Sequence, residues 1–230
     1  MLSLVPRRTM SSRALTPFPT TLKGLIEEIS TRREDRSLID WCKMLSHHVR
    51  VQIEKRVDAY DEDATLSVDL LISLSNCNGR IAATGMCLGG HLAFRAAFDP
   101  RVLASFCWFA TDIHSATLGR GKNDDSLVKV RNGELTGKGE LIMVFGKQDT
   151  HVPRTGRDLI RSTLEEANVP VTFLEVQAQH AFIRDESSKG RYDAALTRSL
   201  FGMMMEVFDR TVARDLGQRV VNHKPVEHVC

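Results

Sequence analysis

One short segment, Gly85-Met86-Cys87-Leu88-Gly89-Gly90, constrains the fold of this chain more than any other part of the sequence. It lies between an apolar run at residues 80–84 and a helical pattern at residues 88–98, which Asp99-Pro100 ends. Glycines two positions before and after Cys87 allow a very tight strand-to-helix turn, because they have no Cβ to clash. This is the pattern of a nucleophile elbow, with cysteine as the nucleophile.

The elbow also predicts the chemistry of Cys87. A cysteine at a helix N-terminus meets unpaired N–H groups and the helix dipole, which favour the thiolate. The same turn aims the backbone N–H of Leu88 at the place where an oxyanion would form. The alternative is a structural, buried cysteine in a glycine-bearing loop, and the flanking strand and helix patterns argue against it.

Strand and helix patterns alternate along the chain from residue 57 onward. Segments separated in this way form a mostly parallel sheet with helices on both faces. We expect helices at residues 57–71, 88–98, 155–167 and 191–210, strands at 80–84, 102–110, 140–145 and 171–176, and a polar loop at 111–139.

Two polar segments follow later strands and carry an acid and a base. Asp149 lies in residues 145–153 (FGKQDTHVP), and His180 lies in residues 179–184 (QHAFIR). Catalytic groups gather at the carboxyl edge of parallel sheets, where Asp149 can orient the imidazole and His180 can move the proton of Cys87. The alternative for Asp149 is an N-cap of the next helix. The chain order nucleophile, acid, base is that of the α/β-hydrolases.

Three segments together resemble the dienelactone hydrolases (carboxymethylenebutenolidases), particularly their fungal relatives. They are GMCLGGHLAFRAAFDPRV, FGKQDTHVP and QHAFIRDESSKGRYD, and the resemblance covers residues 52–210. It implies an α/β-hydrolase fold and cleavage of a small-molecule ester or lactone without a metal or organic cofactor. It assigns Cys87 as nucleophile, His180 as base and Asp149 as the acid that orients it.

The resemblance also implies a role for Arg184, which lies four residues after His180. The family holds the carboxylate of its lactone substrate with an arginine at this position, and a guanidinium offers paired donors that match a carboxylate. The alternative is a solvated ion pair of Arg184 with Asp185 or Glu186. His114 and His151 lie in loops near these segments and are further candidates to line the pocket.

The sequence departs from the family before the elbow. The family has several strands there, with a second oxyanion donor, a second substrate-binding arginine and a glutamate that contacts the cysteine, and none of these is assigned here. We therefore divide the chain into a divergent region 1–56, a hydrolase-like domain 57–214 with incomplete N-terminal strands, and a polar tail 215–230. Loss of one oxyanion donor costs about 100- to 1,000-fold in rate.

Two other functions stay open because of this departure. The chain could be a truncated, inactive relative that acts as a binding module, or a mis-assembled gene model. A glutamine amidotransferase-like enzyme also carries cysteine on an elbow, but it expects a His-x-Glu pair, and Phe182 stands two residues after His180.

Composition limits the partners and the compartment. The 31 basic and 29 acidic side chains nearly cancel, which argues against nucleic-acid binding, and no apolar run approaches 18 residues, which argues against a membrane span. Five widely spaced cysteines without a CxxC indicate a reducing compartment, so we expect a cytoplasmic protein. We also expect a monomer or a weak homodimer. The alternative is mitochondrial, because the first 26 residues carry three arginines and a lysine but no acid.

Overall fold

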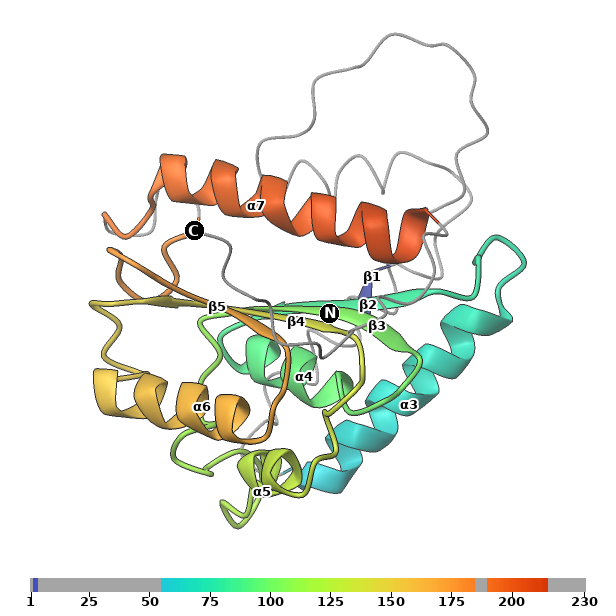
Figure 1. Cartoon of the computed structure of the whole chain (residues 1–230), viewed down its shortest axis with the longest axis horizontal. Helices are drawn as coiled ribbons and strands as arrows, with labels where there is room; N and C mark the ends of the chain where they lie inside the picture. The colour runs from blue at the N-terminus through green and yellow to red at the C-terminus, as the bar shows by residue number, and fades with distance from the viewer. Residues whose placement is uncertain (1, 4–54, 185–189, 215–230) are drawn as a thin grey trace, which may run out of the picture.

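The computed structural model describes residues 2–3, 55–184 and 190–214, and these residues form one α/β domain (Figure 1). Its sheet has five strands in the order β1-β2-β3-β4-β5. Strands β2 to β5 are parallel, while β1 pairs with β2 in the antiparallel sense. The mostly parallel sheet predicted from the sequence is therefore confirmed. The strands are β1 (Leu2–Ser3), β2 (Ile81–Met86), β3 (Val102–Trp108), β4 (Glu140–Gly146) and β5 (Val171–Val176).

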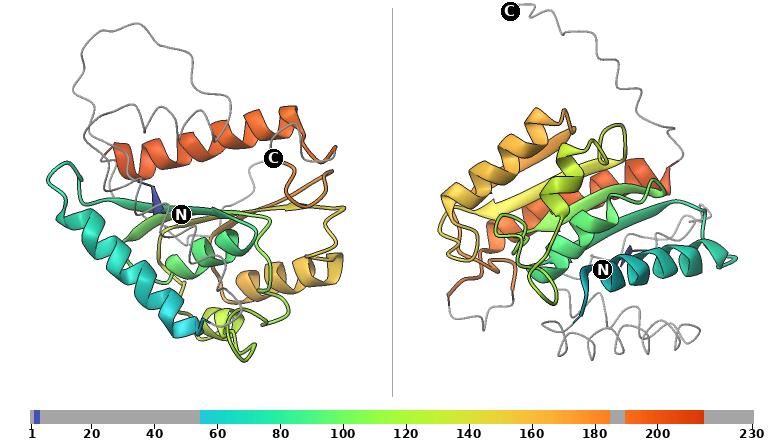
Figure 2. Two further views of the ribbon diagram at one scale, coloured as in Figure 1. Left: turned by 180° about the vertical axis from the view of Figure 1, so that it is seen from behind. Right: turned by 90° about the horizontal axis from the view of Figure 1, so that it is seen from below.

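Helices cover both faces of this sheet, also as predicted. Helix α7 lies on one face, and α3, α4, α5 and α6 lie on the other (Figures 1 and 2). A short π-helical turn, Asp209–Ala213, continues α7. The helices are α3 (Val57–Ser73), α4 (Leu88–Ala96), α5 (Ser126–Arg131), α6 (Arg154–Glu166) and α7 (Ala194–Phe208).

The side chains of β4 show how the sheet separates two apolar cores. Successive side chains of a strand point to opposite faces. Leu141, Met143 and Phe145 belong to the core on the side of α3 to α6. Ile142 and Val144 belong to the core beneath α7. Because helices cover both faces of the sheet, apolar side chains follow one another without a break in β4, and the strand lies between two packed layers.

The sequence-based assignment missed one helix and misplaced the start of another. The expected loop at residues 111–139 contains helix α5, Ser126–Arg131, which is too short to show a helical period among polar neighbours. Helix α7 begins at Ala194 rather than at residue 191. Its start is set by Asp193, whose carboxylate accepts the backbone N–H of Leu196 at 2.9 Å and so caps the first turn.

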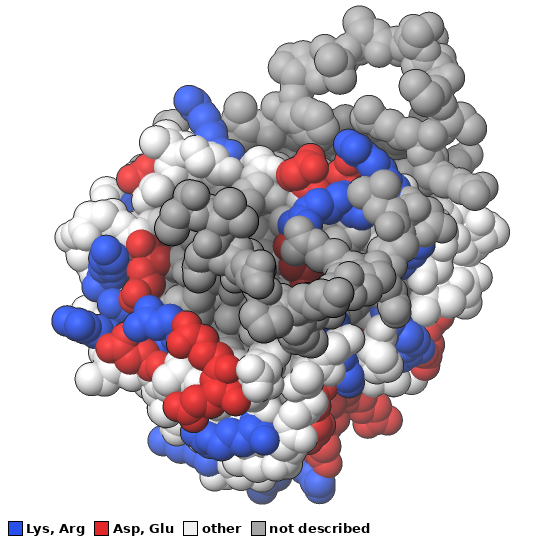
Figure 3. Space-filling model, viewed as in Figure 1, with Lys and Arg blue, Asp and Glu red and all other residues white. Residues whose placement is uncertain are grey.

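The strand β1 was not predicted, and it pairs with only part of β2. Leu2 lies opposite Ala83, and Ser3 lies opposite Ala82. Of the divergent region 1–56, residues 1 and 4–54 lie outside the described residues, as does the whole tail 215–230. In the described part of the chain, no helix is long and apolar enough to cross a membrane. On the face seen in Figure 3, acidic and basic side chains are interleaved.

Candidate active site

Cys87 sits at the apex of the turn from β2 into α4, with φ 58° and ψ −122°. A non-glycine residue rarely adopts positive φ, and such strain is concentrated at functional sites. A Cβ on Gly85 would overlap the carbonyl oxygen of Gly89, and one on Gly90 would lie 2.6 Å from the carbonyl oxygen of Trp108. A Cβ on Gly89 would meet nothing within 4 Å. The turn therefore needs glycine at positions 85 and 90, and the expectation for Gly89 was wrong.

Backbone hydrogen bonds hold the elbow against the end of β3. The N–H of Cys87 donates to the carbonyl oxygen of Trp108 at 3.0 Å. The carbonyl oxygen of Cys87 accepts the N–H groups of Gly90, His91 and Thr111 at 3.0, 3.2 and 3.3 Å. The strained conformation of Cys87 is thus fixed by partners on both α4 and the loop after β3.

The loops after β4 and β5 approach each other closely because Gly146 has no side chain. A Cβ at this position would overlap the carbonyl oxygen of Ala178. The two loops are joined here by a backbone hydrogen bond of 3.0 Å from the N–H of Gln148 to the carbonyl oxygen of Ala178. This contact brings Asp149 from the first loop beside His180 from the second.

The Asp149 carboxylate uses both of its oxygens. Oδ2 lies 2.7 Å from Nδ1 of His180. Oδ1 accepts the backbone N–H groups of His151 and Val152 at 2.8 and 3.4 Å. Helix α6 has Pro153 as its N-cap, so Asp149 is not the N-cap residue of that helix. The carboxylate is instead held rigidly by its own loop and faces the imidazole.

The electrostatics of the site favour a thiolate and an imidazolium. A hydrogen bond with His180 lowers the pKa of Cys87 against the opposing effect of burial, helped by the Leu88 N–H and the Thr111 hydroxyl. Burial alone would lower the pKa of His180, but hydrogen bonds to Asp149 and Cys87 raise it to about 9. Both shifts favour transfer of the proton from the thiol to the imidazole.

The other free cysteines in the described residues have different surroundings. Cys107 lies on β3 and is fully buried, and burial raises its pKa. Cys77 lies half-buried in the turn before β2, where its sulfur accepts the backbone N–H of Gly79 at 3.3 Å. Neither contacts a histidine side chain in the described contacts, so Cys87 alone among these three has the surroundings of a reactive thiol.

Two rings contact the imidazole of His180. The His151 ring lies 4.4 Å from that of His180, and the Phe109 ring lies 4.9 Å from it in an edge-on contact. His114 packs against Gly156 at the start of α6, and burial lowers its pKa. Of the two candidate pocket residues, His151 thus touches the site directly. Among residues 55–184 and 190–214 no group of three or more possible ligands converges on a metal position.

Arg184 is exposed in the turn after the histidine loop, and its backbone N–H donates to the carbonyl oxygen of Ala181 at 3.0 Å. Its alternative ion-pair partners, Asp185 and Glu186, lie outside the described residues. Its role in holding a substrate carboxylate stays a prediction.

Sequence reasoning missed Thr111 and Phe109, which both lie just beyond β3. The rule that functional groups gather at the carboxyl edge of a parallel sheet was the only signal for them. Neither residue belongs to a motif, so that rule alone did not single them out.

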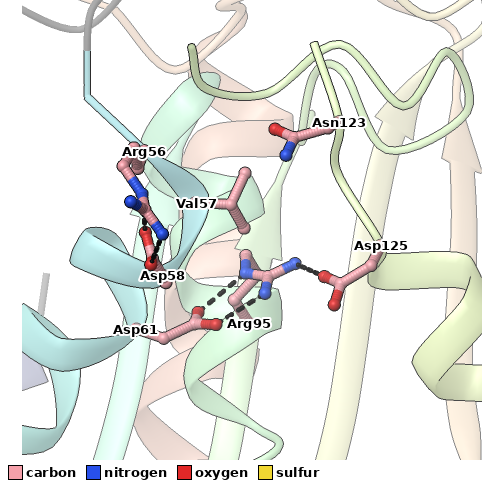
Figure 4. A pocket seen from close by; sticks show the side chains of 7 residues that line it. All are labelled: Arg56, Val57, Asp58, Asp61, Arg95, Asn123 and Asp125. Atoms are coloured by element: carbon pink, nitrogen blue, oxygen red, sulfur yellow. Dashed lines mark hydrogen bonds and ion pairs between the residues drawn. The ribbon is translucent and has the colours of Figure 1, made fainter. Parts of the chain in front are cut away.

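A separate polar pocket of about 230 Å³ lies between α3 and the loop before α5 (Figure 4). At its base the Arg95 guanidinium bonds to Asp61 at 2.7 and 2.6 Å and to Asp125 at 2.7 Å. None of Cys87, Asp149 and His180 lines this pocket. Its described lining residues are Arg56, Val57, Asp58, Asp61, Arg95, Asn123 and Asp125.

The elbow, the parallel sheet and the order of the three site residues define an α/β-hydrolase fold. Solved structures support this class by fold. A Klebsiella pneumoniae protein provisionally named dienelactone hydrolase has a TM-score of 0.53 at 18% identity, covering 64% of this chain and 59% of its own. A dienelactone hydrolase-like promiscuous phosphotriesterase from metagenomic libraries has a TM-score of 0.51 at 16% identity, with 66% and 62% covered.

The sequence comparisons identify the family within this class. The model of the dienelactone hydrolase family matches residues 43–212, and the chain belongs to that family. A Saccharomyces cerevisiae protein provisionally named carboxymethylenebutenolidase is 54% identical over 181 residues, which are 78% of this chain. The match spans 66% of that yeast relative, so about a third of its length has no counterpart in the aligned region.

Proposed function

We propose that this chain hydrolyses an ester or lactone bond, with Cys87 as nucleophile, His180 as proton carrier and Asp149 as the residue that orients the imidazole. One observation carries the proposal. The pKa of the strained Cys87 is lowered chiefly by His180, whose Nδ1 lies 2.7 Å from the Asp149 carboxylate. Membership of the dienelactone hydrolase family supports the class of bond.

The first half of the reaction forms a thioester. The thiolate of Cys87 attacks the carbonyl carbon of the substrate, and its sulfur forms a new bond to that carbon. As the tetrahedral intermediate collapses, the bond from the carbonyl carbon to the leaving oxygen breaks. His180, already an imidazolium, gives its proton to the leaving oxygen. A lactone ring opens in this step, and the new hydroxyl stays tethered to the acyl group.

The second half releases the product and restores the site. Neutral His180 takes a proton from a water molecule, whose oxygen attacks the thioester carbon. The bond from carbon to sulfur then breaks, the carboxylic acid leaves, and the thiolate and imidazolium are formed again. Asp149 keeps the imidazole in one orientation and stabilises its positive charge in both halves.

Two further residues have proposed roles. The backbone N–H of Leu88 follows the nucleophile at the start of α4 and is the proposed oxyanion donor. The same N–H also helps to lower the pKa of Cys87, which supports this role. Arg184 is the proposed partner of a substrate carboxylate.

Free thiols at Cys77, Cys87 and Cys107 suit the proposed cytoplasmic location.

The direct test is hydrolysis of dienelactone and of an aryl acetate by the purified chain, compared with its Cys87→Ala variant. We expect the variant to lose measurable turnover. Cys77→Ala is the matched control, because that half-buried cysteine lies in a turn away from His180. It should retain the wild-type rate.

A second measurement separates an inactive binding relative from an enzyme whose substrate has not been supplied. Iodoacetamide should label Cys87 faster than Cys77, and at a lower pH. A Cys87→Ala variant as active as the wild type would contradict the proposed nucleophile. Slow labelling of all cysteines alike would favour the inactive relative.

A further inference from the structure

Arg157 carries a buried positive charge near the start of α6. Its side chain is 4% exposed, whereas arginine is seldom buried unless its charge is paired. A cation near a helix N-terminus is also disfavoured by the helix dipole. The burial of this side chain therefore depends on the groups that its guanidinium binds, and the proposed mechanism gives it no role.

The guanidinium binds two segments at once. Its Nη1 donates to the carbonyl oxygen of Val152 at 2.8 Å. Its Nε donates to the carboxylate of Glu175 within an ion pair. Val152 belongs to the loop after β4 that carries Asp149. Glu175 lies near the end of β5, five residues before His180. Arg157 thus joins the loop of the acid to the strand that leads to the base.

Val152 is also a partner of the Asp149 carboxylate. Its N–H donates to Oδ1 of Asp149 at 3.4 Å, beside the N–H of His151 at 2.8 Å. Val152 is fully buried, so its backbone cannot turn without disturbing the bond from Arg157. The other carboxylate oxygen, Oδ2, lies 2.7 Å from Nδ1 of His180. The orientation of the carboxylate toward the imidazole therefore depends on a loop that Arg157 holds.

The Glu175 carboxylate is shared by two arginines of α6. Its second oxygen accepts Nη1 of Arg161 at 3.0 Å. Burial would raise the pKa of Glu175, but hydrogen bonds from Arg157 and Arg161 lower it, so the group is ionised at neutral pH. In the described contacts, Arg161 binds no atom of the loop after β4. The two arginines therefore share one carboxylate, but only Arg157 also binds the loop of the acid.

We propose that Arg157 is a positioning residue, which keeps the Asp149 carboxylate directed at His180 by binding the Val152 carbonyl and anchoring it to Glu175. This role rests on the proposed function, in which His180 carries the proton. Arg157 touches neither the substrate nor the sulfur, and it acts only through the loop after β4.

The charge of Arg157 by itself would act on the imidazole in the opposite direction. A nearby cation lowers the pKa of an imidazole, so its removal would raise that pKa. Losing the hold on Asp149 instead weakens the hydrogen bond to the imidazole, which lowers the pKa. The other titratable groups at His180 are Cys87 and His151, and both are kept the same in every comparison. The sign of the shift therefore separates the two effects.

The test is an NMR titration of the His180 ring in the full chain. Every protein in the series carries Cys87→Ala, so that no thiol titrates together with the imidazole. Arg157→Met removes both bonds of the guanidinium. We expect the pKa of His180 to fall by about one unit, equal to one hydrogen bond to a charged group. Arg161→Met is the matched control, because it loses a bond to the same Glu175, and it should leave that pKa unchanged.

Arg157→Lys covers the case in which Arg157→Met does not fold. Lysine keeps a cation beside Glu175, but it lacks the planar fork that reaches two partners. We expect the pKa of His180 to fall in this variant too. An unchanged or raised pKa in either Arg157 variant would overturn the proposed role and leave Arg157 a purely structural residue. An equal fall in Arg161→Met would also overturn it, because that variant keeps the bond to Val152.

The titration needs no turnover, so it separates this proposal from the proposed function. In chains that retain Cys87, Arg157→Met should lower kcat for an aryl acetate about tenfold and leave KM unchanged, while Arg161→Met keeps the wild-type rate. If the wild type hydrolyses the ester and the titration does not move, only the role of Arg157 is overturned. If the titration moves as expected and no chain hydrolyses any ester, Arg157 still positions Asp149, and the proposed function fails.

Discussion

His180 and His91 each lie beside an aspartate, but in different surroundings. The Nδ1 of His180 lies 2.7 Å from Oδ2 of Asp149, whose other oxygen accepts only backbone N–H groups in the described contacts, and Cys87 also raises the pKa of His180. His91 is fully buried on α4. Its Nε2 lies 2.9 Å from the Ser126 hydroxyl, and its Nδ1 has no hydrogen-bond partner among the described groups.

The second pair shares its carboxylate with a guanidinium. Asp124 lies 3.4 Å from His91 and 2.9 Å from Arg95, which also binds Ser126 at 2.9 Å. Burial would raise the pKa of Asp124, but hydrogen bonds from His91 and Ser126 and the charge of Arg95 hold it below its ordinary value. The same residue types therefore form a buried structural network here. At the sheet edge the histidine interacts instead with the Cys87 thiol, and there we propose a reactive site.

The largest expected effect comes from removing the histidine of the first pair. In His180→Gln, no group accepts and returns the proton, so we expect kcat for an aryl ester to fall about 100- to 10,000-fold. His91→Gln is the matched control, because that ring lies away from the sulfur. Its rate per folded molecule should stay within about threefold of the wild type. Equal losses in the two variants would remove the distinction between the two pairs.

Substitutions among the buried polar residues around Arg95 should lower the stability of the protein instead. Arg95→Met leaves the Asp124 carboxylate buried without its cation, and we expect the free energy of unfolding to fall by about 3–5 kcal/mol. Arg101→Met is the control, since its ion pairs with Asp99 and Asp69 are partly exposed and contribute at most about 1 kcal/mol. Urea unfolding at pH 7 measures both changes. Similar losses in the two variants would mean that the Arg95 network is no stronger than a surface pair.

A Ser126 variant tests whether the buried polar side chains stabilise the fold as one network. Its hydroxyl contacts Nε2 of His91 and Asp124 Oδ1 at 2.9 and 2.8 Å. Because Ser126→Ala leaves buried polar groups without this partner, we expect a loss of about 1–3 kcal/mol in unfolding free energy. The control Ser162→Ala, at an exposed site on α6, should change stability by less than about 0.5 kcal/mol. A Ser126 variant as stable as this control would argue for independent pairs.

The smallest effect concerns pH. The proposed mechanism needs the Cys87 thiolate, whose pKa is lowered, and the His180 imidazolium, whose pKa is raised to about 9. We therefore expect the rate to rise with pH on the acid side and to fall as pH rises through about 9, losing about tenfold per further unit. Rates at saturating aryl ester, corrected for alkaline hydrolysis, measure this. A rate that continued to increase at pH 10 would contradict the need for imidazolium.

The elbow and both catalytic loops were predictable because each is a local signal. Cys87 stands between two glycines after an apolar run, and Asp149 and His180 each follow a strand. The need for glycine at position 90 was not predictable, because it depends on Trp108, a residue of the neighbouring strand. The sequence analysis assigned the second required glycine to position 89 because the elbow motif has glycine there, whereas the packing requires glycine at position 90.

The Arg95 network could not be predicted for a related reason. Its members come from three segments: Asp61 on α3, Arg95 on α4, and Asp124 to Ser126 at the start of α5. Each is an ordinary charged or polar residue in its own segment, and only the fold brings them together. The numbers of acidic and basic residues in the sequence do not show which ion pairs are buried and which are solvated.

The distance along the chain between Cys87 and His180 has a consequence during synthesis. The ribosome makes the elbow early, and the imidazole that most lowers the pKa of Cys87 is made only after three further strands. Until then the nascent chain carries an ordinary thiol, which is protonated at neutral pH and slow to react with oxidants. We therefore expect the cysteine to become fully reactive only once all five described strands have been translated, so that incomplete chains are spared much of the oxidation of a thiolate.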